Sequence, residues 1–93
     1  MDSEQKALKR IEKAQKAKWV IEQEPIREAF DYLDREFIEL WGRSGTTEGR
    51  ENIWRARQTL IRVKELLAKA ISDGEVSKAD LRRIEEDRRT QAA

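Results

Sequence analysis

The chain contains no cysteine and no histidine among its 93 residues. Without cysteine there is no disulfide, thiol nucleophile or thiolate metal ligand. Without histidine, the commonest metal ligand and the side chain best suited to proton transfer near neutral pH are both missing. We therefore expect a protein that is not an enzyme and that takes no metal, cofactor or small-molecule substrate.

Proline, glycine and long apolar runs are also scarce. One proline and four glycines are typical of a chain with long helices. The longest apolar run, Trp19-Val20-Ile21, is far too short to cross a bilayer, and the first four residues lack the apolar region of a signal peptide. We expect a soluble protein that is made inside the cell and has no membrane partner.

Charged residues make up 42% of the chain and apolar residues 38%, with a net charge of only +1. So much charge raises the possibility of disorder, but the apolar residues are regularly spaced rather than absent. We expect one small domain over residues 1–93, with flexible termini at 1–3 and 89–93.

Two ladders of apolar residues, spaced alternately by three and four positions, flank a short loop at residues 42–47. Such spacing places one apolar stripe on each of two helices, and a short loop makes the helices antiparallel. The sequence therefore predicts an all-α fold built on an antiparallel helical hairpin over about 25–41 and 48–72. The ladders are Ile26, Phe30, Leu33, Phe37 and Leu40, then Ile53, Ala56, Leu60, Val63, Leu67 and Ala70.

Local signals set the expected ends of these helices. Pro25 suits the first turn of the first hairpin helix, and Gly42 is a candidate left-handed stop for it. Thr47 is a candidate cap for the second hairpin helix, which Asp73-Gly74 is expected to end.

A further helix is predicted on each side of the hairpin. The N-terminal helix, about 3–23, has Ser3 as its candidate cap and mostly alanines between lysines on its apolar face, so it is expected either to dock loosely or to serve another molecule. The second hairpin helix overhangs the first, and the N-terminal helix or a second copy of the chain would cover that overhang. A short C-terminal helix, about 78–88, begins at a capping sequence.

The hairpin helices carry opposite charge: residues 25–42 have net charge −3 and residues 43–74 have net charge +3. Arg50, Arg57 and Lys64 are spaced by seven, so they are candidates for contacting nucleic-acid phosphates, with Arg82 and Arg83 as a second group. The alternative is that these cations pair with the acidic helix and keep the surface hydrated. We favour pairing, because nucleic-acid-binding domains usually carry a large positive excess.

Trp41 and Trp54 are expected near the hairpin loop, with Phe37 beneath them. They could simply pack the tip, or they could anchor a protein interface, where tryptophan is enriched. Trp54 lies just off the apolar ladder and is therefore the better interface candidate of the two. The full set of interface candidates is Trp19, Trp54, Leu66 and Ile71.

Two stretches carry a resemblance to known proteins: Ile21-Glu22-Gln23-Glu24-Pro25-Ile26-Arg27-Glu28-Ala29-Phe30, and, beyond Trp41, Thr47-Glu48-Gly49-Arg50-Glu51-Asn52-Ile53-Trp54. Over about residues 19–71 the chain resembles small all-helical proteins of tailed bacteriophages. The resemblance implies a protein of particle assembly or DNA packaging that binds other proteins in multiple copies. It also implies synthesis in the host cytoplasm, with the virion as a further location.

The functional expectation is therefore a non-enzymatic structural or assembly protein, either a virion component or a packaging accessory such as a small terminase subunit. Its expected partners are proteins, including copies of itself. The alternative is a nucleic-acid-binding or host-directed adaptor that uses the basic hairpin helix and the C-terminal arginines.

Overall fold

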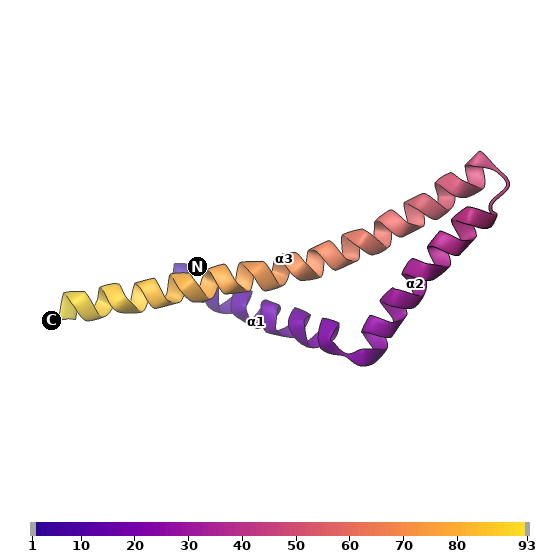
Figure 1. Ribbon diagram of the computed structural model, residues 1–93. Coiled ribbons are helices and arrows are strands. Elements are labelled where there is room, and N and C mark those ends of the chain that lie inside the picture. Colours follow the sequence, from indigo (N-terminus) through magenta and orange to yellow (C-terminus); the bar gives the residue numbers. More distant parts are fainter. Residues whose placement is uncertain (1, 93) are drawn as a thin grey trace. The chain divides into compact units, whose positions relative to one another are not determined.

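The computed structural model describes residues 2–92, which form three α-helices and no strand (Figure 1). These are α1 (Ser3–Glu22), α2 (Glu24–Arg43) and α3 (Thr47–Ala92). The predicted all-α fold is confirmed, and the observed bounds of the first two helices lie within two residues of those expected.

The helices pack as two units. The α1–α3 unit comprises residues 2–19 and 67–92, and the hairpin unit comprises Val20–Leu66. In the hairpin unit, Arg50 near the start of α3 lies over Trp41 near the end of α2, and Lys64 further along α3 pairs with Asp34. The helices are therefore antiparallel, as predicted.

The predicted break between a helix ending near residue 72 and a short helix over about 78–88 is wrong. A single helix, α3, runs through Asp73-Gly74 without interruption. Gly74 is buried, and a methyl group placed on it would overlap the Cβ atom of Ala14. This glycine lets the backbone of α3 approach α1, so its role is packing rather than helix termination.

Small side chains form the core of the α1–α3 unit. Ala7, Ala14 and Ala17 of α1 are buried, as are Ala70 and Ser77 of α3. The alanine face of α1, for which loose docking or another molecule was expected, is therefore packed against α3.

The direction of α1 follows from two contacts. Glu4 at its start pairs with Arg88 at 2.7 Å, whereas Ala14 further along meets the earlier residue Gly74. The two helices are thus antiparallel. Of the two expected covers for the overhang of the longer hairpin helix, the N-terminal helix and a second copy, the structure shows the first, because α1 contacts α3 at Gly74 and Arg88.

The helix ends differ slightly from the predicted ones. The Asp2 carboxylate accepts a hydrogen bond from the Gln5 N–H, and the Thr46 hydroxyl oxygen accepts one from the Gly49 N–H. The caps are therefore Asp2 and Thr46, each one residue before the predicted Ser3 and Thr47, because the capping residue is the last one outside the helix.

The prediction of a left-handed stop at Gly42 is also wrong. α2 continues through Gly42 to Arg43, and no glycine in the described chain has a positive φ. Ser44, in extended conformation, follows the helix and its N–H donates to the carbonyls of Leu40 and Trp41. Pro25 lies in the first turn of α2, as expected.

Of the terminal segments predicted to be flexible, Ser3 and residues 89–92 are helical, whereas Met1 and Ala93 lie outside the described residues. No helix within residues 2–92 is long and apolar enough to cross a membrane.

Candidate protein interface

An apolar groove lies at the tip of the hairpin, between the end of α2 and the start of α3. Its volume is about 240 Å³. We call it the tip groove, and its lining residues are Phe37, Ile38, Trp41, Ile53, Trp54 and Arg57. The predicted meeting of Trp41 and Trp54 near the loop, with Phe37 beside them, is confirmed.

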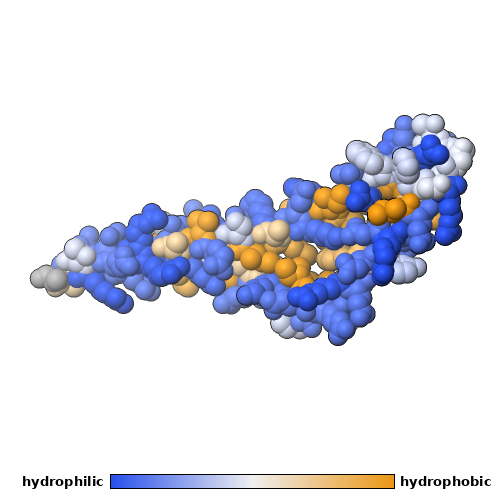
Figure 2. All heavy atoms as spheres, in the orientation of Figure 1, coloured by the Kyte–Doolittle hydropathy of each residue, from blue (hydrophilic) through white to orange (hydrophobic). Residues whose placement is uncertain are grey.

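The large side chains of the tip groove are only partly covered. Ile38 is 61% exposed, Trp41 49% and Trp54 57%, whereas Phe37 and Ile53 are half-buried. Figure 2 shows apolar side chains open to solvent over the hairpin, bordered by hydrophilic ones. The tip therefore combines internal packing by Phe37 and Ile53 with an exposed aromatic surface.

Arg50 ties the loop to this surface. Its Nε donates a hydrogen bond to the Ser44 carbonyl at 3.2 Å, and its guanidinium carbon lies 5.2 Å from the centre of the Trp41 ring. The Ser44 hydroxyl donates in turn to the Thr46 carbonyl. Since a cation over an indole face is attracted to it, these contacts hold Trp41 in place at the edge of the groove.

Arg57 supplies the charge in the tip groove. It is exposed, and within residues 2–92 its side chain makes no hydrogen bond or ion pair. An apolar groove with one unpaired cation suits a partner that offers an apolar side chain next to a carboxylate.

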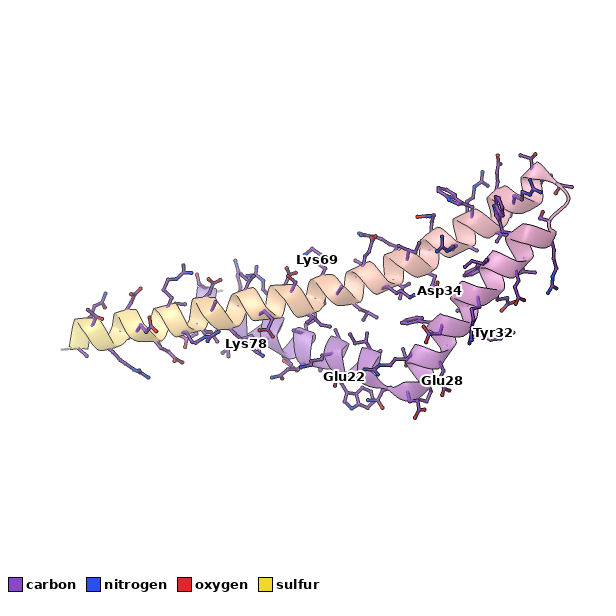
Figure 3. The ribbon with its side chains drawn as sticks, in the orientation of Figure 1. Glu22, Glu28, Tyr32, Asp34, Lys69 and Lys78 are labelled. Carbon is purple, nitrogen blue, oxygen red and sulfur yellow. The ribbon has the colours of Figure 1, made fainter. Side chains whose placement is uncertain are left out.

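Lys64, unlike Arg50 and Arg57, pairs with a carboxylate of α2. Its Nζ lies 2.7 Å from the Asp34 carboxylate of α2 and 5.4 Å from the centre of the Phe30 ring, and both charged side chains are half-buried. Figure 3 shows Asp34 on the side of α2 that faces α3. Lys64 is therefore neutralised inside the hairpin, as the pairing alternative predicted for such cations.

The second predicted basic pair, Arg82 and Arg83, belongs to the α1–α3 unit. Arg82 donates to the Lys78 carbonyl at 3.5 Å, and Arg83 lies 3.7 Å from the Asp80 carboxylate. The five nucleic-acid candidates are thus divided between the two units, and two of them, Lys64 and Arg83, are paired with carboxylates.

The four predicted interface residues are also dispersed. Trp54 lines the tip groove, and Leu66 is 50% exposed in the hairpin unit. Trp19 is exposed and Ile71 half-buried in the α1–α3 unit. Sequence reasoning missed Ile38, although the signal was available: Ile38 follows ladder residue Phe37 just as Trp54 follows ladder residue Ile53.

A second hollow, with a volume of about 350 Å³, lies on the outer side of α2. Tyr32, Arg35, Glu36 and Glu39 line it. Figure 3 shows Tyr32 pointing away from α3. Four side chains of one helix form this hollow without any contribution from α3, so it lacks the enclosing second wall of the tip groove.

The described residues contain no cluster of three or more acidic side chains arranged to hold a metal ion. No family model matches the chain, and comparisons with curated proteins and with solved structures find no match.

Proposed function

We propose that this chain is a non-enzymatic assembly protein that works in several copies through helix-mediated protein contacts. The observation that carries the proposal is the exposure of large apolar side chains at the tip groove, where two tryptophans and an isoleucine are about half exposed or more. Exposed aromatic and apolar side chains gathered around one groove mark an interaction surface, because scattered single residues would not form a continuous patch.

The rest of the hairpin unit supports this proposal. Leu60 is its single buried side chain, whereas seven large apolar side chains are exposed: Tyr32, Ile38, Leu40, Trp41, Trp54, Val63 and Leu66. Further burial of these groups in an assembly would add stability, at roughly 25 cal/mol for each Å² of apolar surface removed from water.

Light scattering coupled to size exclusion tests the proposal. We expect a particle mass above the 11.0 kDa of one chain, and a shift toward the monomer in Trp54→Glu because the new charge would be buried at the contact. The matched control is Val76→Glu, at an exposed position in the α1–α3 unit. A wild-type protein that is monomeric from about 1 to about 100 µM would refute self-assembly.

A role in phage particle assembly or DNA packaging is a finer proposal, and it rests on the resemblance over residues 19–71. No match to a known family supports it. Location of the gene beside portal or packaging genes would support this role, whereas a non-viral gene neighbourhood would count against it.

The nucleic-acid-binding alternative has weaker support, because Lys64 pairs with Asp34 and Arg50 is held by the loop. Changing Arg50, Arg57 and Lys64 together to Glu tests it. Salt-dependent DNA binding that is lost in this variant would favour the alternative, and binding that is unchanged would reject a role for these residues.

A further inference from the structure

We propose that the occupant of the tip groove is the hairpin of a second copy, packed so that α2 of each copy faces α3 of the other and both tips lie at the same end. This inference rests on the proposed function, since it specifies how the copies meet.

The face is defined by the tip groove and extended by helical spacing. Ile38, Trp54 and Arg57 line the same groove. Asp31 precedes Ile38 by seven residues, which is about two helical turns, so it lies on the same side of α2. The face therefore carries apolar groups near the tip, with a carboxylate on α2 and a guanidinium on α3 further from it.

Both charged groups on this face are available. Asp31 and Arg57 are exposed, and neither side chain makes an ion pair or hydrogen bond with another described residue. By contrast, the neighbouring charged pair Asp34 and Lys64 is already satisfied within the hairpin.

The charges of the two helices choose between the two symmetric ways of stacking this face on itself. α2 has six acidic and three basic residues, and the part of α3 in the hairpin unit has three acidic and five basic residues. With the tips at opposite ends, each helix would face its own equivalent and meet like charge. With the tips together, acidic α2 faces basic α3, so the favourable arrangement is the parallel one.

The levels of the residues fit the parallel arrangement. Ile38 lies five residues before the end of α2 and Trp54 seven residues after the start of α3, so both are about 8 to 10 Å from the tip ends of their helices. Asp31 lies twelve residues before the end of α2 and Arg57 ten after the start of α3, or about 18 and 15 Å. Ile38 thus meets Trp54 of the partner subunit, and Asp31 meets Arg57 of the partner subunit.

The resulting assembly is a four-helix bundle around a two-fold axis parallel to the hairpins. Each contact occurs twice, because a two-fold interface uses the same surface on both copies. The exposed indole of Trp54 becomes its apolar centre, and two Asp31–Arg57 pairs flank that centre on the side away from the tips.

A charge swap tests the pairing. We expect Asp31→Arg and Arg57→Asp each to weaken self-association about tenfold or more, because each creates facing like charges, and the double variant to restore it to within about threefold. Arg55→Asp is the control, because Arg55 is also exposed, pairs with Glu51 of its own helix and points from another side of α3. Circular dichroism on every variant confirms that the helices are retained.

The relative direction of the two hairpins is tested with a single spin label. The chain has no native cysteine, and at Gly45 a Cβ atom meets nothing within 4 Å and φ is not positive, so Gly45→Cys places a label on the loop without distortion. We expect a distance between the two labels within about 20 Å, whereas hairpins with tips at opposite ends would separate the labels by about 30 Å or more.

These outcomes separate this inference from the function on which it rests. Two results would overturn the parallel bundle and leave the assembly function standing. One is an oligomer with a long distance between the labels, and the other is an oligomer whose particle mass is unchanged by substitutions at Asp31 and Arg57. A monomeric wild type overturns both. A third outcome would assign the tip groove to a different protein. In it, the wild type is a monomer whose tryptophan fluorescence changes when an acidic amphipathic peptide is added, and the fluorescence of the Trp54→Glu variant does not change with the same peptide.

Discussion

The α1–α3 unit and the hairpin unit bury different kinds of side chain. In the α1–α3 unit the buried residues are alanines, one glycine and one serine, whereas the single buried residue of the hairpin unit is Leu60. Small residues let two helix backbones approach closely, and Gly74 against Ala14 is the tightest example. In the hairpin unit, the large side chains of Trp41 and Trp54 instead remain about half exposed.

This difference distinguishes a unit that is packed within the chain, the α1–α3 unit, from one that leaves apolar surface for other chains, the hairpin unit. In the α1–α3 unit, α1 covers the small side chains of α3 within the same chain. The core of this unit therefore needs no second chain to cover it. The hairpin unit leaves large apolar groups in solvent on both helices. The exposed aromatic surface is therefore concentrated in the unit whose own core is smallest.

The largest expected effect comes from removing the one large buried side chain of the hairpin unit. Leu60 is 8% exposed, and Leu60→Ala should lower the free energy of unfolding by about 2 to 5 kcal/mol, because it removes buried apolar surface and leaves a cavity. Urea unfolding followed by circular dichroism measures the loss. Leu66→Ala, at a position that is 50% exposed, should cost less than about 1 kcal/mol, and equal losses would contradict a core centred on Leu60.

A glycine pair tests the close helix approach of the α1–α3 unit. Gly74→Ala should lower the free energy of unfolding by about 1 to 3 kcal/mol, because the new methyl group meets the Ala14 side chain. Gly42→Ala, in the last turn of α2 with open space around it, should raise stability by up to about 1 kcal/mol, since alanine is the better helix former. Stabilisation by both substitutions would mean that α1 does not approach α3 at Gly74.

The hairpin was predictable because its information is local to each helix. Apolar positions every three or four residues fix the buried stripe, and a short loop fixes the antiparallel direction. The role of Gly74 was not predictable in the same way. A glycine in a helical pattern either ends the helix or admits a neighbour, and here the deciding residue, Ala14, lies on a different helix.

In the candidate site, too, features local to one helix were predictable from the sequence and contacts between helices were not. Trp54 was identified because it lies beside the apolar ladder, and the same criterion applied to α2 would have found Ile38. The ion pair of Lys64 could not be identified from the sequence, because its partner Asp34 is thirty residues away in the chain and becomes a neighbour only when the hairpin closes. Spacing by seven groups Lys64 with Arg57, but it does not tell which of the two cations is already paired.

The smallest expected effect concerns charge on the surface of the α1–α3 unit. Asp73 accepts a hydrogen bond from Lys69 at 2.7 Å, and this contact, with the nearby charges of Arg10 and Lys13, lowers the pKa of the Asp73 carboxyl below its ordinary value of 3.8. Because the folded-state pKa is the lower one, the ionised carboxylate contributes stability above pH 3.8, and this contribution is lost as the pH falls through the folded-state pKa.

A matched variant isolates this contribution. Asp73→Asn cannot ionise, so the difference in urea midpoint between wild type and variant should be small but measurable at pH 7, should vanish below the folded-state pKa, and should shrink in high salt because the pair is exposed. A carboxyl titration by NMR gives the pKa directly. A value at or above 3.8 would mean that Lys69, Arg10 and Lys13 do not lower the pKa of Asp73.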